Sequence, residues 1–265
     1  MNGGLLGELA LGPVEKIEFA SADGTMVEAL VAKPADFVVG RRYPTVMWLH
    51  GGPASQFTFG FNATAQLFAA NGYVVVMPNP RGSIGYGEDF AQATAREWGE
   101  KDYDDVMAAI DAAIARGWAD PDRLGVAGWS YGGILTNHVL IRTDRFKAAM
   151  SGASIGNAYA NYGNDHYQLM YHLGWGAPWV ERERWDALSP FYQVENIVTP
   201  TLWMGGAVDW NVPIINSEQM YLAMRYLGRD TQMVVYPNEH HGIRRPSFQK
   251  DRYERWLAWF DKYLK

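Results

Sequence analysis

The sequence predicts an α/β fold in which a mostly parallel sheet is covered by helices on both faces. Short apolar runs alternate along the chain with longer segments of helical periodicity. Strands that are buried on both faces read as apolar runs, and parallel strands need a crossover between them, usually a helix. The chain has 265 residues, of which 48% are hydrophobic, so it can bury a sizeable core. We therefore expect residues 1–265 to form a single domain.

The individual elements follow from local pattern. Val14 to Phe19 and Met26 to Ala32 alternate apolar and polar residues around Asp23-Gly24, which predicts a hairpin. Six later apolar runs predict buried strands, at residues 45–49, 73–77, 123–127, 146–150, 201–204 and 233–236. Helical spacing predicts helices at residues 63–70, 103–115, 134–141, 217–226 and 248–263. Asp102 stands where a cap of the second of these helices is expected.

Residues 157–185 interrupt this alternation, because they show no clean strand or helix period. We interpret the segment as an excursion between two strands, at the edge of the sheet where strand C-termini place ligands. The alternative is ordinary helical packing with aromatic side chains buried beneath it. His166 and His172 belong to this segment and are candidates for substrate contact. Its aromatic residues are Tyr159, Tyr162, Tyr167, Tyr171, Trp175, Trp179 and Trp185.

Composition argues against several classes of partner. The net charge of −6 is scattered without a basic stripe, so we expect no nucleic-acid partner. No apolar run approaches the ~20 residues of a membrane span, so we expect no membrane partner. The N-terminus lacks the basic and apolar regions of a signal peptide, and we expect a cytoplasmic protein. Cysteine is absent, which excludes disulfides, thiolate chemistry and cysteine-based zinc sites, and neither a metal nor a cofactor is expected.

A candidate nucleophile lies between the strand predicted at 123–127 and the helix that follows. The segment Gly128-Trp129-Ser130-Tyr131-Gly132 has the Gly-x-Ser-x-Gly pattern of the nucleophile elbow of α/β-hydrolases. The turn is too tight to admit side chains on either side of the serine, which explains the glycines. The pattern predicts that Ser130 is held at the tip with its hydroxyl exposed.

An acid and a base should follow the serine, in the chain order of α/β-hydrolases. Asp209 comes just after a predicted strand, where the orienting carboxylate belongs. The loop after the last predicted strand offers two adjacent bases, His240 and His241, and strand position alone does not separate them. A serine hydroxyl needs a neutral imidazole to take its proton, and the imidazole needs a carboxylate on its other nitrogen. We expect His50 to be structural and His138 to lie in the core.

An oxyanion hole requires two hydrogen-bond donors. One would be the backbone N–H of Tyr131, and the other a backbone N–H of Gly51 or Gly52, where glycine lets the N–H groups point inward. Arg81 and Asp102 are expected to form structural pairs beneath the loops. The residues expected to form the acyl or side-chain pocket are aromatic: Trp129, Tyr159, Tyr162 and Tyr167.

Together these motifs resemble the catalytic domain of the prolyl oligopeptidase family of serine peptidases, which includes acylaminoacyl and dipeptidyl peptidases. The resemblance rests on Ser21-Ala22-Asp23-Gly24, His50-Gly51-Gly52-Pro53, Asn79-Pro80-Arg81-Gly82-Ser83, Gly85-Tyr86-Gly87, Gly128 to Gly133, Asp209 with Val212-Pro213, and Tyr236-Pro237 with His241-Gly242. It implies Ser130 as the nucleophile, Asp209 as the orienting acid and His241 as the base. The Glu-x-His-Gly pattern of the family puts the base at the second histidine, and His240 replaces a usual small residue.

The resemblance implies a serine hydrolase that cleaves acylaminoacyl or short oligopeptide bonds through an acyl-enzyme. A carboxylesterase with the same triad, acting on small esters, and a non-catalytic binding protein of the same fold are the alternatives. Dipeptidyl peptidases carry a tyrosine where His50 stands, so this form resembles the acylaminoacyl branch.

Family members usually carry an N-terminal β-propeller, and this chain begins about where that propeller would end. The chain is then either a natural single-domain relative or a catalytic domain without its propeller. An apolar face exposed by that absence would favour a homo-oligomer.

Overall fold

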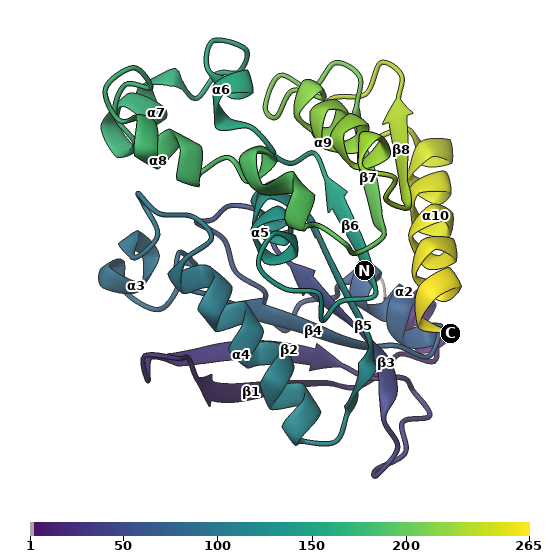
Figure 1. The fold of residues 1–265 in the computed structure, drawn as a ribbon. Coiled ribbons are helices and arrows are strands. Elements are labelled where there is room, and N and C mark those ends of the chain that lie inside the picture. Colours follow the sequence, from purple (N-terminus) through teal and green to yellow (C-terminus); the bar gives the residue numbers. More distant parts are fainter. Residues whose placement is uncertain (1–2) are drawn as a thin grey trace.

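The structure is a computed structural model that describes residues 3–265. Met1 and Asn2, part of the N-terminal stretch considered for a signal peptide, lie outside the described residues. Over the described residues, one eight-stranded sheet runs through the molecule in the order β1-β2-β4-β3-β5-β6-β7-β8 (Figure 1). Its strands are β1 (Val14–Ala20), β2 (Met26–Ala32), β3 (Tyr43–Leu49), β4 (Val74–Asn79), β5 (Ala119–Trp129), β6 (Ala148–Gly152), β7 (Thr201–Gly206) and β8 (Thr231–Tyr236).

The sheet is parallel from β4 through β3 to β8, and antiparallel where β2 pairs with β1 and β4. The hairpin predicted around Asp23-Gly24 is present, and Gly24 has a φ of +83°, which glycine adopts without steric cost. The predicted mostly parallel sheet is therefore confirmed. The carboxyl ends of β3, β5, β7 and β8 lie along the same edge of this sheet, so the loops that follow these strands can meet.

Helices cover both faces of the sheet, as predicted. One core cluster joins the sheet to α4, α5 and α9, and a second joins the opposite face to α2 and α10 (Figure 1). The helices are α1 (Gly3–Gly7), α2 (Ala63–Ala70), α3 (Glu88–Gln92), α4 (Lys101–Ala115), α5 (Tyr131–Leu140), α6 (Ala158–Asn161), α7 (Gln168–Gly174), α8 (Arg182–Ala187), the 3-10 helix η1 (Pro190–Asn196), α9 (Ile215–Tyr226) and α10 (Pro246–Leu264). Among residues 3–265, no helix combines the length and the apolar character that crossing a bilayer requires.

The segment 157–185 folds into the short helices α6, α7 and α8, which gather at one end of the molecule (Figure 1). Tyr171, Trp175 and Trp185 are fully buried beneath them, with the Tyr171 and Trp175 rings stacked 4.5 Å apart. Trp179, by contrast, is 64% exposed. The segment is thus both an excursion between β6 and β7 and a small helical layer with its own aromatic packing.

Candidate active site

Ser130 lies in the turn between β5 and α5, with a φ of +61° that is uncommon for a residue other than glycine. A Cβ on Gly128 would lie 2.2 Å from the carbonyl carbon of Gly132, and a Cβ on Gly132 would lie 2.2 Å from the carbonyl oxygen of Leu49. Only glycine fits at either position. The Ser130 N–H donates to the Gly152 carbonyl at 2.9 Å, which fixes the turn to the end of β6.

An acid–base pair occupies the loops after β7 and β8. The distance between His241 Nδ1 and Asp209 Oδ2 is 2.8 Å. The other carboxylate oxygen of Asp209 accepts the backbone N–H groups of Asn211 at 2.8 Å and Val212 at 2.9 Å. The Asp209 side chain is 1% exposed, so the carboxylate is held in one orientation. With Nδ1–H donating to Asp209, the Nε2 of His241 is left to accept a proton.

The loop that carries His241 is fixed against the serine turn. The indole Nε1–H of Trp129 donates to the His241 carbonyl at 2.9 Å, and so links the residue before Ser130 to the histidine. His240 is exposed, so it is His241 that pairs with Asp209. Over residues 3–265, the Ser130 hydroxyl forms no hydrogen bond with His241. Such catalytic hydrogen bonds are often long in enzymes without ligand and tighten in the substrate complex.

The expected oxyanion donors surround the same serine. Gly52 and Tyr131 line one small cavity of about 60 Å³ together with Ser130. A Cβ on Gly51 would lie 3.6 Å from the Ser130 Cβ, so this backbone also passes close to the nucleophile. His50 supports the loop, since its Nδ1–H donates to the Gly51 carbonyl at 2.7 Å. Its Nε2 forms a second hydrogen bond, with the hydroxyl of Ser83.

Asp102 reaches the serine turn from below. Its carboxylate accepts hydrogen bonds from the Tyr131 hydroxyl and from the backbone N–H groups of Gly99 and Tyr103. Complete burial raises the pKa of Asp102 to about 6, against the opposing effect of those hydrogen bonds. The expected cap position is wrong, because α4 begins at Lys101 and Asp102 lies inside the helix.

Arg81 is structural, as expected. Its guanidinium forms an ion pair with the buried Asp105 at 2.7 Å, and it also bonds Asp23 in the hairpin turn. Because Asp105 is 0% exposed, this pair lies beneath the loop rather than in the site. Arg81 therefore ties the hairpin to α4.

Tyr167 is the expected pocket residue that the structure places at the serine. It lines the small cavity, and its hydroxyl donates to Asn211, two residues after Asp209. The remaining lining is apolar or uncharged: Pro53, Trp98, Ile134, Ile155, Met170, Tyr171, Asn211 and Val212. Of these, Asn211 and Val212 had a signal in the sequence, because they follow the candidate acid directly.

The other three aromatic residues expected in the pocket do not line the small cavity. Trp129 supports the His241 loop, and its ring lies 5.4 Å from the guanidinium of Arg252. The hydroxyl of Tyr159 donates to Asp186 at 2.9 Å, and the hydroxyl of Tyr162 bonds His172 at 2.9 Å. These side chains hold the serine turn or the helical layer together and do not line the small cavity.

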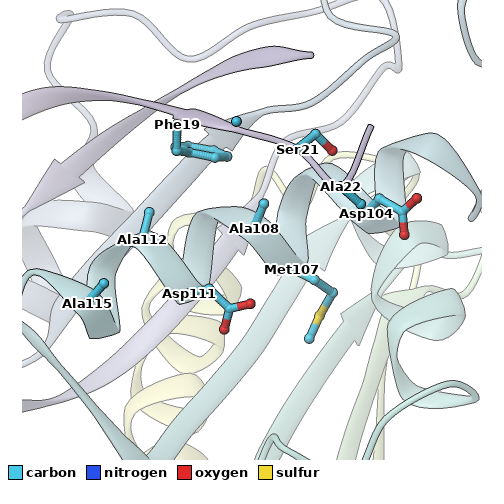
Figure 2. Close-up of a pocket in the computed structure, with 10 residues that line it drawn as sticks. Phe19, Ser21, Ala22, Asp104, Met107, Ala108, Asp111, Ala112 and Ala115 are labelled. Atoms are coloured by element: carbon cyan, nitrogen blue, oxygen red, sulfur yellow. The ribbon is translucent and has the colours of Figure 1, made fainter. Parts of the chain in front are cut away.

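A larger hollow of about 840 Å³ adjoins the small cavity. It lies between the segment 91–98 and α7, and His166 lines it, whereas His172 does not. A separate hollow of about 500 Å³ lies between the end of β1 and α4, and none of the candidate catalytic residues lines it (Figure 2). Of these three cavities, only the small one is lined by Ser130, so we expect the substrate carbonyl there and the rest of the substrate in the hollow that adjoins it.

The mostly parallel eight-stranded sheet with helices on both faces places the chain in the class of proteins with the α/β-hydrolase fold. Comparison with known proteins narrows the class: the chain belongs to the prolyl oligopeptidase family, whose family model matches residues 59–265.

Similar proteins are peptidases. The chain is 38% identical to the uncharacterized peptidase YuxL of Bacillus subtilis, over 94% of this chain and 39% of that protein. It is 32% identical to the acylamino-acid-releasing enzyme of Arabidopsis thaliana, over 96% of this chain and 35% of that protein. The acylaminoacyl peptidase of Pyrococcus horikoshii superposes with a TM-score of 0.93 at 30% identity, over 100% of this chain and 44% of that one. The chain thus spans about two fifths of the length of these relatives.

Proposed function

We propose that the chain hydrolyses acylaminoacyl or short oligopeptide bonds, with Ser130 as the nucleophile, Asp209 as the orienting acid and His241 as the base. The observation that carries the proposal is the 2.8 Å contact between His241 Nδ1 and the buried Asp209 carboxylate, in a loop bonded to the serine turn. The names of the relatives support the same substrate class.

In the proposed mechanism, the Ser130 hydroxyl attacks the substrate carbonyl carbon while Nε2 of His241 takes its proton. The buried Asp209 carboxylate stabilises the imidazolium that forms. The imidazolium then gives its proton to the leaving amine, the C–N bond breaks, and an ester on Ser130 remains. Water hydrolyses that ester by the same steps, with His241 again taking and returning the proton.

We infer that the negative oxygen of the tetrahedral intermediate is held by the backbone N–H of Tyr131 and that of Gly52 or Gly51. Tyr131 opens α5, so its N–H lies among those that the helix leaves without an internal partner. The buried Asp102 carboxylate holds the Tyr131 side chain in place. A donor of this kind contributes on the order of 10²–10³ in turnover.

Small esters are the second candidate substrate class, which would make the chain a carboxylesterase. None of the described side chains lining the small cavity is charged, so the cavity offers no partner for the charged terminus of a peptide. A neutral, apolar acyl group therefore suits the cavity in either an ester or an acylated amino acid. Competition between matched acyl esters and acylaminoacyl anilides separates the two classes.

The test of the proposal uses a fluorophosphonate probe and the Ser130→Ala variant. We expect the wild type to be labelled at Ser130 and to hydrolyse acyl p-nitrophenyl esters or acylaminoacyl anilides, and Ser130→Ala to lose both properties. Ser247→Ala, which removes an exposed serine on α10, is the matched control and should keep both. Residual hydrolysis by Ser130→Ala above a few per cent of wild type would show that the nucleophile is misassigned.

A further inference from the structure

Two cavities meet beside the candidate nucleophile. The small cavity that contains Ser130 has a volume of about 60 Å³, and the neighbouring hollow has about 840 Å³. Four residues line both of them: Pro53, Trp98, Tyr167 and Met170. These four side chains are therefore the wall that separates a carbonyl group at Ser130 from the larger space.

The two volumes suit different acyl groups. The small cavity, at about 60 Å³, has less than a tenth of the volume of the neighbouring hollow, so on its own it holds only a short acyl group. The larger hollow falls within the range of small-molecule sites, which is about 300–1,000 Å³. Its lining is mostly apolar, and includes Ala91, Ala95, Leu169 and Leu173. A longer apolar chain would find room only if it passed the wall.

Met170 is the part of this wall that can move. Trp98 is 8% exposed and packs against the Trp175 and Tyr131 rings at 4.7 and 5.4 Å. Tyr167 is held by its hydrogen bond to Asn211. Met170 is 43% exposed on α7, and its unbranched thioether adopts other rotamers at little cost.

We propose that the hollow between the segment 91–98 and α7 binds the distal part of elongated apolar acyl groups, and that Met170 controls entry from the small cavity. The inference rests on the proposed function, because it assumes that the acyl carbonyl lies at Ser130. It adds a substrate preference to that function: straight apolar chains too long for the small cavity alone.

The test is a series of p-nitrophenyl esters from acetyl to decanoyl. If the chain fills the hollow, each added methylene should raise kcat/KM by about fourfold until the hollow is occupied, since burial of a methylene contributes about 0.8 kcal/mol. Met170→Trp should lower the octanoyl-to-acetyl ratio of kcat/KM at least tenfold, and Met170→Ala should raise it. Leu222→Ala, on the exposed side of α9, should leave the ratio at the wild-type value.

A binding measurement separates failure of this inference from failure of the proposed function. Calorimetry on Ser130→Ala with the p-nitroanilides of octanoic acid and acetic acid should show tighter binding of the octanoyl compound. Met170→Trp in the same background should abolish the difference. That result in an enzyme that hydrolyses neither the esters nor acylaminoacyl anilides would overturn the proposed function and support the hollow as a binding site. Equal binding of both compounds, or an ester profile that Met170→Trp leaves unchanged, would overturn the inference.

Discussion

At the scale of single residues, the choice between two adjacent histidines is the sharpest issue. Sequence position left His240 and His241 equal, and only the family pattern favoured the second. In the structure, His241 reaches Asp209, whereas His240 is exposed. The backbone conformation of the loop sets the direction of each side chain and so decides which histidine reaches the carboxylate. The amino-acid sequence of a loop does not show this conformation.

We therefore expect His241→Ala to lower kcat about 10⁴-fold or more, as loss of a triad base does. His240→Ala should leave kcat nearly unchanged and serves as the matched control. Steady-state kinetics with an acyl p-nitrophenyl ester would measure kcat for both variants. The reverse ranking of the two variants would contradict the assignment of the base.

The aromatic residues that line the small cavity could be predicted only in part from the sequence. The sequence indicated that aromatic residues of 157–185 would face the substrate, and of Tyr159, Tyr162 and Tyr167 only Tyr167 lines the small cavity. Tyr159 and Tyr162 instead bond neighbours within the helical layer, Asp186 and His172. Short helices turn successive aromatic side chains in different directions, and tertiary packing rather than composition decides which of them face the cavity.

At the scale of elements, the serine turn depends on how closely β5, α5 and β3 approach one another. A Cβ at Gly132 would lie 2.2 Å from the Leu49 carbonyl oxygen and 2.8 Å from that of His50, and backbone atoms cannot swing aside. Gly132→Ala should therefore lower the free energy of unfolding by at least about 2 kcal/mol. Urea denaturation measures the change.

The control for this substitution is Gly7→Ala in α1, where an added Cβ meets nothing within 4 Å. It should leave the urea midpoint close to that of the wild type. Equal midpoints for the two variants would show that the turn relaxes around the methyl group, and the argument from close approach would then be wrong.

Element existence was predictable where burial controls sequence. The central strands lie inside the sheet with helices on both faces, so their residues are apolar runs that a reader can find. Their ends were not predictable: β5 begins at Ala119 and includes Asp120, Pro121 and Asp122, and β6 ends at Gly152. Residues 120–122 lie at a register shift between the Ala119 and Leu124 pairings with β3, and Pro121 and Asp122 are exposed, so no apolar run marks the start of this strand. The helices α6, α7 and α8 were missed because they are too short for a helical period to emerge.

At the scale of the whole molecule, two buried groups make opposing contributions to stability in acid. Complete burial lowers the pKa of His138 to about 3, and burial raises the pKa of Asp102 to about 6. Between about pH 6.5 and 3, the unfolded chain binds a proton at His138 that the folded chain does not. This difference lowers the free energy of unfolding as pH falls. Between about pH 6 and 4, the folded chain binds a proton at Asp102 that the unfolded chain does not. This difference raises the free energy of unfolding as pH falls.

Removal of His138 should expose this balance. His138→Leu deletes a buried ring whose Nε2 has no hydrogen-bond partner among the described residues. The free energy of unfolding of the variant minus that of the wild type should be about 2 kcal/mol larger at pH 5 than at pH 8. That difference arises because His138 of the wild type is protonated in the unfolded chain below a pKa of ~6.5 but stays neutral in the folded chain.

Asp102→Asn should change the difference from wild type in the opposite direction, because it removes the group that gains its proton in the folded state. Urea titrations at the two pH values measure both variants, and a His138→Leu effect of equal size at pH 5 and pH 8 would mean that the buried imidazole does not resist protonation in the folded chain.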